Sequence, residues 1–323
     1  MKRSKRWIAM ALLTVFLVSL PGCGMFETKL ARAIQKMSRI DNLHYFLDAQ
    51  LDLRLSLTES DSELAPQDGA EQPASEQEAA EEGSSPDETE SELLQLDLRG
   101  SFEAEGDLYV NPLRMSMRST LRLPGSDSKT EAYLEKEESA YYYYSRLNDG
   151  TLWQKQGFAA PDSAQVKGLR YIVKGAESFA LAGEEEIGGR FAERYDGYLD
   201  GEYLSGLLKL YDVYELLADD FGLQLKDEVF DNLPDLPVSL WIDRETGMII
   251  HAEADLTAVA QQIATTQLLE TASAVKLDTL GLSLRLTGLK LALSLSDFNA
   301  ADAFSIPAEA KEAWGSELKP WES

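Results

Sequence analysis

Few side chains in this sequence could do covalent or metal chemistry. Cys23 is the only cysteine in the 323-residue chain, and His44 and His251 are its only histidines. A single cysteine excludes an intrachain disulfide framework and any cysteine-based zinc or iron–sulfur site. Two histidines leave little for a metal centre or a His-dependent triad. The sequence also contains no Gly-x-Ser-x-Gly elbow, His-Glu-x-x-His pair or Walker loop. We therefore expect no enzyme, no cofactor and no metal site.

The carboxylates are numerous and not diagnostic. The chain has 56 Asp and Glu against 30 Lys and Arg, for a net charge of −26. Some carboxylate pair will lie at glycosidase spacing by chance, so that chemistry cannot be argued from the sequence. The negative charge argues against nucleic-acid binding, which needs a cationic surface. His44 lies on the polar side of an alternating stretch and His251 follows an Ile-Ile pair. We interpret both as surface or boundary histidines.

Cys23 is the one residue with a specific context. Basic residues at 2–6 precede an uncharged stretch, 8–20, whose length as a helix is about 20 Å, short of the roughly 30 Å hydrocarbon core of a bilayer. Leu20-Pro21-Gly22-Cys23 then resembles a bacterial lipobox. The pattern predicts a signal peptide at 1–22 and a Cys23 carrying diacylglycerol and an N-linked acyl chain such as palmitate. The protein would be anchored on the extracytoplasmic face of the cell membrane. The alternative is an ordinary signal peptide with an incidental cysteine.

A strongly acidic segment covers residues 58–92. It is rich in Glu and Asp and has no Lys, Arg or aromatic residue, so it cannot bury enough apolar surface to order itself. We predict a disordered insertion within a single domain at 23–323. A solvated loop is the plain interpretation, and a cation-binding or partner-binding arm is the alternative.

On both sides of the insertion, apolar residues alternate with polar ones. This period of two predicts long strands with one buried face, joined as a hairpin whose tip holds the insertion. Near the C-terminus the apolar positions change from even to odd at Thr287-Gly288. A bulge in one long strand is the favoured explanation of this change. A tight hairpin turn at the same two residues is the alternative. The alternation before and after the insertion runs through Leu43, Tyr45, Leu47, Ala49, Leu51, Leu53, Leu55 and Leu57, then Leu94, Leu96, Leu98, Phe102, Ala104 and Leu108.

Helical periodicity is limited to 27–38, 202–220 and 257–272, with Asp200 as a candidate N-cap of the second helix. A one-sided antiparallel sheet must cover its apolar face. The fold class is therefore α+β, a large curved antiparallel sheet (a half-barrel) with about three helices packed on its concave face. Such a face can leave an apolar cleft.

The order of these features resembles the LolA/LolB-type fold of bacterial lipoproteins, particularly uncharacterised Gram-positive LolA-like lipoproteins. The resemblance covers roughly residues 26–313 apart from the insertion. It rests on the lipobox, the first helix and long strand, Asn111-Pro112, the Tyr-rich strand closing on Trp153, and the Trp-x-Asp-x-x-Thr-Gly turn at 241–247. Asp243 and Thr246 can cap that turn and Gly247 can take its positive φ. The resemblance implies an apolar cavity for acyl chains or, in related modules, a role in sensing envelope stress.

The leading hypothesis is a membrane-anchored, non-catalytic lipoprotein that binds a lipid, acyl chain or other amphiphile as carrier or receptor. The alternative is an envelope interaction or sensory module, with a protein partner and no lipid cargo. The basic residues of the first helix, Lys29, Arg32, Lys36 and Arg39, are expected to face the membrane. The predicted ligand-binding positions on the apolar sheet face are Leu47, Leu51, Leu53, Leu96, Leu98, Phe102, Met115, Met117, Leu291 and Leu293.

Overall fold

The structure is a computed structural model that describes residues 29–59, 92–137, 140–148, 150–159, 179–210, 227–274, 280–313 and 315–319. The predicted signal peptide, Cys23 and residues 60–91 of the acidic segment lie outside the described residues. None of the helices within these ranges is long and apolar enough to cross a bilayer.

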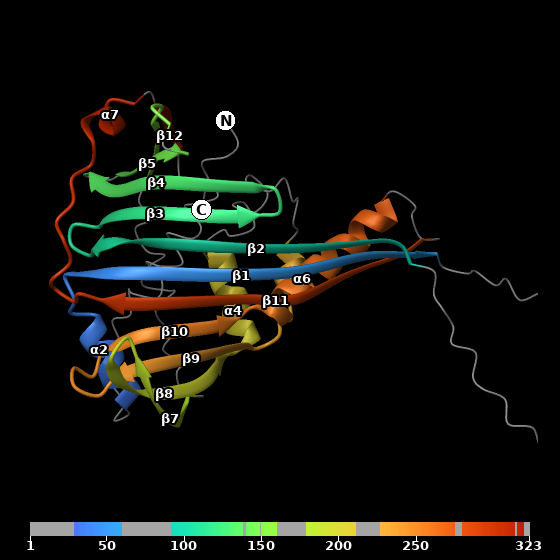
Figure 1. The fold of residues 1–323 in the computed structure, drawn as a ribbon, viewed down its shortest axis with the longest axis horizontal. Helices are drawn as coiled ribbons and strands as arrows, with labels where there is room; N and C mark the ends of the chain where they lie inside the picture. The colour runs from blue at the N-terminus through green and yellow to red at the C-terminus, as the bar shows by residue number, and fades with distance from the viewer. Residues whose placement is uncertain are drawn as a thin grey trace, which may run out of the picture.

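A single twelve-stranded sheet forms most of the molecule (Figure 1). The strand order is β12-β6-β5-β4-β3-β2-β1-β11-β10-β9-β8-β7. All neighbours are antiparallel except β12, which runs parallel to β6 at one edge. The strands are β1 (Asn42–Glu59), β2 (Glu92–Tyr109), β3 (Arg114–Leu123), β4 (Ser126–Glu137), β5 (Ala140–Leu147), β6 (Gln154–Ala159), β7 (Ala180–Ile187), β8 (Arg190–Leu199), β9 (Leu236–Asp243), β10 (Ile249–Asp255), β11 (Leu280–Ser296) and β12 (Gly315–Lys319).

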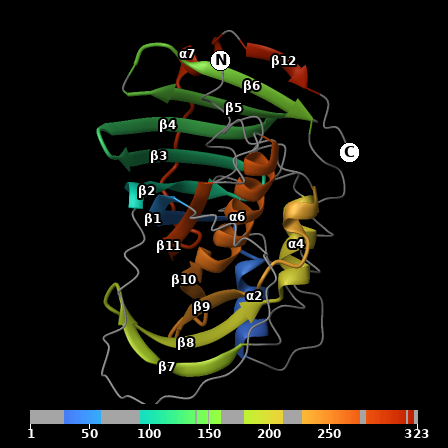
Figure 2. The same cartoon turned by 90° about the vertical axis from the view of Figure 1, so that its right-hand side faces the viewer.

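The sheet is strongly curved, and the helices α2 (Lys29–Met37), α4 (Gly201–Leu210) and α6 (Thr257–Ala274) lie on its concave side (Figure 2). A 3₁₀ turn, η2 (Asp227–Phe230), and a short helix, α7 (Ala308–Lys311), complete the described helical elements. The predicted α+β class, with a curved antiparallel sheet and helices on its concave face, is confirmed.

The long central strands follow the predicted hairpin. β1 and β2 pair from Asn42–Tyr109 to Thr58–Glu92, so the unassigned residues 60–91 connect their far ends. β11 is one continuous strand, and its register against β1 shifts between Asp52 and Leu53, which places Thr287 outside the pairing. The predicted bulge is therefore confirmed, and the alternative of a hairpin turn is wrong. The bulge keeps the leucines before and after it on one face of the sheet.

Alternation assigns each strand residue to the concave or the convex face. Tyr141 and Tyr143 lie in the main core on the concave side, whereas Tyr142 and Tyr144 pack on the convex side. There the C-terminal chain crosses the sheet and contributes Phe304, Ile306 and Ala310 to a small second cluster. The four successive tyrosines are thus divided equally between the faces, as the alternation predicts.

Local turn chemistry also follows the sequence. Asp200 accepts hydrogen bonds from the backbone N–H groups of Glu202 and Tyr203 and so caps α4. In the β9–β10 turn, Asp243 accepts a 2.6 Å bond from the Thr246 hydroxyl, and Gly247 has a φ of 64°. The Trp-x-Asp-x-x-Thr-Gly element therefore acts as a turn.

Candidate ligand-binding face

One end of the concave face is closed by α2. Five of the predicted ligand-binding residues lie there, in a core shared with Leu30, Ile34 and Met37 of the helix. Side chains packed this closely belong to the folding core, because little of their surface remains for a ligand. These five are Leu47 and Leu293 (1 % exposed), Met115 (0 %), Phe102 and Met117 (3 %).

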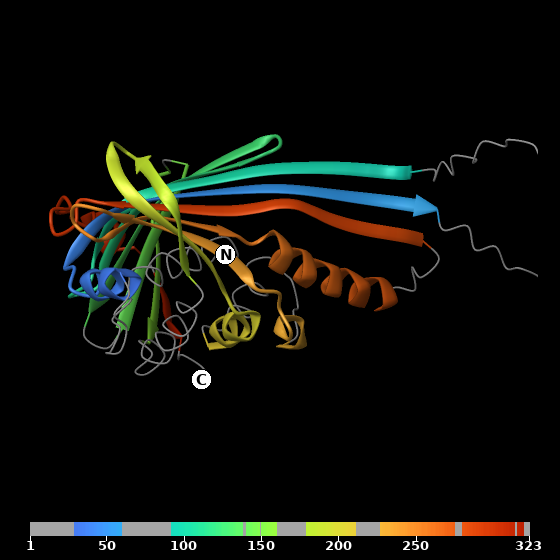
Figure 3. The ribbon, with the colours of Figure 1, turned by 90° about the horizontal axis from the view of Figure 1, so that it is seen from below.

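Farther along the same face the packing becomes looser. Leu51, Leu53, Leu98 and Leu291 continue the apolar side of β1, β2 and β11, and all four are only half-buried. The backbone of Leu96 continues β2 in the same direction, but its side chain lies outside the described residues. Figure 3 shows β1, β2 and β11 extending well past α2. The concave face therefore has a packed end and an open, leucine-lined part, which we call the leucine floor (Leu51, Leu53, Leu98, Leu289 and Leu291).

The helix α6 runs beside β11 at the border of the leucine floor (Figure 3). It is attached by polar bonds around the bulge: Thr257 accepts a 2.9 Å bond from the Leu289 N–H, and Gln261 accepts one from the Leu286 N–H. Among the α6 side chains that the structure describes, 257–266, only Val259 is fully buried, in a core with α4 and η2, and residues 260–266 are all half-buried. A helix packed through one stripe would alternate between buried and exposed positions. α6 is therefore partly exposed around its circumference.

Buried hydroxyls interrupt the apolar concave face beyond β2, among them those of Ser119, Thr130 and Ser145. Ser119 on β3 is 5 % exposed and lies opposite Thr130 on β4, which is 3 % exposed. Neither hydroxyl has a hydrogen-bond partner within the described part of the chain. Sequence analysis missed this pair, although the signal is present: Ser119 occupies an inward position between Met117 and Leu121 in an otherwise apolar alternation.

The basic residues of α2 are all exposed, and the contacts of Lys29 and Lys36 hold the helix in place. Lys29 forms an ion pair with Glu193 of β8, and this hydrogen bond, with one from the Tyr195 hydroxyl, lowers the pKa of Glu193 against the effect of burial. Lys36 donates a 2.6 Å bond to the Thr246 carbonyl. Both lysines thus help fix α2 under β8 and the β9–β10 turn. The membrane-facing role of Lys29, Arg32, Lys36 and Arg39 stays a prediction.

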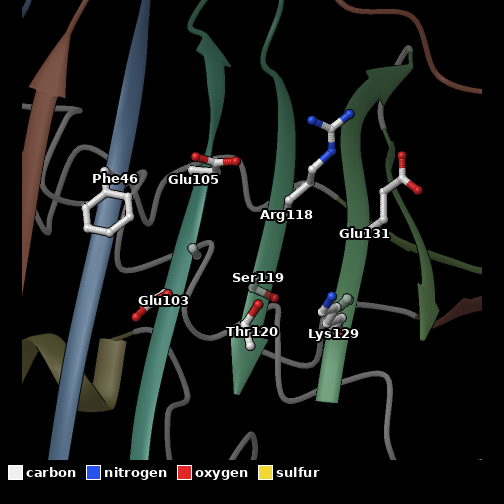
Figure 4. A pocket seen from close by; sticks show the side chains of 10 residues that line it. Phe46, Glu103, Glu105, Arg118, Ser119, Thr120, Lys129 and Glu131 are labelled. Carbon is white, nitrogen blue, oxygen red and sulfur yellow. The ribbon is translucent and has the colours of Figure 1, made fainter. Parts of the chain in front are cut away.

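The convex face has a different chemistry. Figure 4 shows one of its shallow grooves, about 340 Å³, where Phe46 lies among charged side chains of β2, β3 and β4. A second groove of about 490 Å³ crosses β1, β11, β10 and β9. Ion pairs such as Arg122–Glu103 (2.7 Å) and Arg146–Glu131 cross the strands of this face. Solvent-exposed pairs of this kind contribute little to stability, so they chiefly mark the side of the sheet that faces water.

The two histidines lie on the convex face. His44 contacts Asp107 at 2.9 Å. His251 contacts Ser294 at 2.9 Å and Glu253 at 3.3 Å, and its ring lies edge-on to Trp241. Within the described residues, no group of three or more His, Cys, Asp or Glu side chains could hold a metal ion.

No family model and no curated protein matches this chain. Similar solved structures include the lipoprotein LppX of Mycobacterium tuberculosis, with 11 % identity, a TM-score of 0.40 and coverage of 85 % of this chain and 95 % of that chain. LprF from Mycobacterium bovis has 12 % identity, a TM-score of 0.36 and coverage of 84 % and 90 %. A DUF1329 family protein from Desulfovibrio piger has 9 % identity, a TM-score of 0.17 and coverage of 80 % and 87 %.

Proposed function

We propose that this protein is a membrane-anchored, extracytoplasmic lipoprotein that binds the acyl part of a lipid or other amphiphile on its concave face, without catalysing a reaction. The observation that carries the proposal is the change along one face from the packed core under α2 to the half-buried leucine floor. A folded protein gains stability by covering apolar surface. A floor that its own core leaves partly exposed supports a role in binding an apolar ligand.

The anchor is the second part of the proposal. Cys23 follows the lipobox-like Leu20-Pro21-Gly22, and only five residues separate it from Lys29 at the start of α2. Even fully extended, such a short connection reaches only about 20 Å, which keeps the domain close to the bilayer. Replacement of Cys23 by Ala should move the full chain out of the membrane fraction or leave it as the unprocessed precursor. Unchanged lipid labelling and fractionation of the variant would contradict the anchor.

Native mass spectrometry of the full chain, purified in a mild nonionic detergent from its host's membranes, tests the ligand. We expect a stoichiometric adduct beyond the mass of the lipidated N-terminus, and an organic extract that contains a molecule with an acyl chain. Protein that carries no adduct, even after incubation with the host's lipid extract, would contradict binding on the leucine floor.

A specific surface feature favours the second candidate, an interaction or sensory module. Phe191 and Leu181, on the β7–β8 hairpin at one sheet edge, are 66 % and 59 % exposed. Large apolar side chains on an edge hairpin are suited to contact a protein partner. If this candidate is correct, crosslinking in intact cells should trap one membrane protein, and Phe191→Ser should abolish the crosslink without changing lipid content.

A further inference from the structure

We propose that the β7–β8 hairpin docks on the surface of the bilayer, with Phe191 and Leu181 entering the lipid headgroup layer next to the start of α2. This inference rests on the proposed anchor at Cys23. It goes beyond the anchor because it assigns the surface of the domain that meets the membrane, and it commits to a neutral lipid surface as the partner.

Two large apolar side chains lie exposed on one face of this hairpin. Phe191 of β8 is 66 % exposed and Leu181 of β7 is 59 % exposed. Leu181 is paired with Tyr195, which follows Phe191 by four residues on β8. Positions two and four apart on a strand share a face, and so do residues paired across two strands. Phe191 and Leu181 therefore lie on the same face, about 13 Å apart along the hairpin.

The start of α2 contacts the hairpin between these two side chains. Glu193 is midway between Phe191 and Tyr195 on the same face, and it accepts a hydrogen bond from Lys29, the first residue of α2 (Figure 2). Only five residues separate Lys29 from Cys23, so an acylated Cys23 would lie within about 20 Å of the start of this helix. The anchor would hold this face of the hairpin near the bilayer, which favours lipid over protein as its partner.

The charges of the hairpin limit how deeply it can enter. Glu186 is exposed and lies opposite Phe191, and transfer of its carboxylate into hydrocarbon would be costly. Docking should therefore stop at the boundary between headgroups and acyl chains. The chain's net charge of −26 repels an anionic leaflet within a Debye length of about 8 Å, so a neutral leaflet suits the hairpin better. Nearby cations compensate other carboxylates of the hairpin: Lys29 pairs with Glu193, Arg244 with Glu184 at 2.8 Å, and Arg194 with Glu185 at 3.2 Å.

Leu152 provides a matched control. It is 84 % exposed, more than Phe191, and it lies between β5 and β6, near the sheet edge opposite to β7. Apolar exposure alone would favour Leu152, so a difference between the two positions reports the orientation of the domain. Cys23 is the only cysteine and its thiol is blocked once acylated, so Phe191→Cys or Leu152→Cys introduces the one free thiol of the lipoprotein.

The test reconstitutes each full-length lipoprotein, labelled at its new thiol with an environment-sensitive fluorophore, into phosphatidylcholine vesicles. The vesicles carry a lipid-borne quencher either near the headgroups or deep among the acyl chains. At position 191 we expect a blue shift of the emission and quenching by the shallow quencher only, and at position 152 neither change. Adding Leu181→Ser to the Phe191→Cys chain should lower the ratio of docked to undocked protein by about fivefold, because about half of the transfer free energy of a leucine is lost.

Three results would overturn the inference while leaving the anchor intact. The probe at position 191 could stay in water although the protein floats with the vesicles. Stronger quenching at position 152 would place the opposite sheet edge at the bilayer. A change at position 191 in the host's membranes but not in pure lipid vesicles would assign the hairpin to a protein partner. Protein that does not float with the vesicles at all would instead refute the anchor, and with it that part of the proposed function.

Discussion

Two leucines on the same face of one strand should respond very differently to truncation. Leu47 and Leu51 both point to the concave side of β1, four residues apart. Leu47 is 1 % exposed and lies in the core under α2, whereas Leu51 is half-buried on the leucine floor. If the floor is a ligand surface, Leu47→Ala should destabilise the fold strongly, and Leu51→Ala should chiefly weaken lipid binding.

The expected magnitudes follow from burial. Leu→Ala removes three carbon groups, worth about 2.4 kcal/mol when fully buried, and a residual cavity raises the cost to about 3–4 kcal/mol at a well-packed site. That is the expectation for Leu47→Ala. For Leu51→Ala, about half of the transfer free energy and no closed cavity give about 1 kcal/mol. The predicted difference of roughly 2–3 kcal/mol is well above the error of a denaturation experiment.

Urea unfolding followed by the tryptophan fluorescence of the lipid-free full chain measures both changes, with the slope m expected to be equal in the two variants. Native mass spectrometry then compares lipid occupancy, with Gln50→Ala on the convex face as the neighbouring control. If Leu51→Ala costs as much stability as Leu47→Ala and leaves lipid occupancy unchanged, the concave face is a closed core along its whole length. The binding proposal would then be wrong.

Three further variants test local features of the fold. Gly106→Ala places a methyl group 1.9 Å from the Ser116 carbonyl oxygen; urea unfolding should show a loss of about 1–3 kcal/mol, against no loss for Gly183→Ala, where a methyl group meets nothing within 4 Å. Burial acts to raise the pKa of Asp243, but hydrogen bonds from the turn outweigh it and lower the pKa. The ionised carboxylate therefore stabilises the fold above about pH 4 and ceases to do so as the pH falls through the lowered value, so the stability difference between wild type and Asp243→Asn should shrink in acid. Thr257→Val leaves a backbone N–H of β11 without its 2.9 Å acceptor and should cost about 1–3 kcal/mol in thermal unfolding, whereas Thr257→Ser, which keeps the hydroxyl, should not.

The parts of the fold that depend on a short repeat of apolar and polar residues could be predicted from the sequence. The alternation after Leu43 predicted the direction of the described side chains of β1, and the phase change at Thr287-Gly288 predicted the bulge in β11. Both follow because the side-chain period of a strand is two, so one extra residue must appear as a change of parity. The capping of α4 by Asp200 was predictable for the same local reason.

The packing along the concave face was not predictable, because it depends on contacts between distant segments. Leu47 and Leu51 have the same pattern in the sequence, and only the position of α2 distinguishes the packed residue from the half-buried one. The basic helix shows the same limit: Lys29 pairs with Glu193, which is 164 residues away in the chain. Nothing in the local charge pattern of α2 could reveal that contact.

The dimensions of the described helices explain why the middle of the concave face matters. β1 has 18 residues and is about 60 Å long, whereas α2, with 9 residues, and α6, with 18, are about 14 and 27 Å long. A helix about 10 Å across covers roughly two strands at a spacing of about 4.8 Å. α2 lies at the packed end and α6 lies beside β11, so these two helices are too short and too narrow to cover the whole inward side of β1 and β2. If Leu51 nevertheless belongs to a closed core, Leu51→Ala should cost as much stability as Leu47→Ala. If the leucine floor accepts a ligand, the same variant should lose lipid occupancy at little cost in stability, so this comparison decides between a closed core and a binding face.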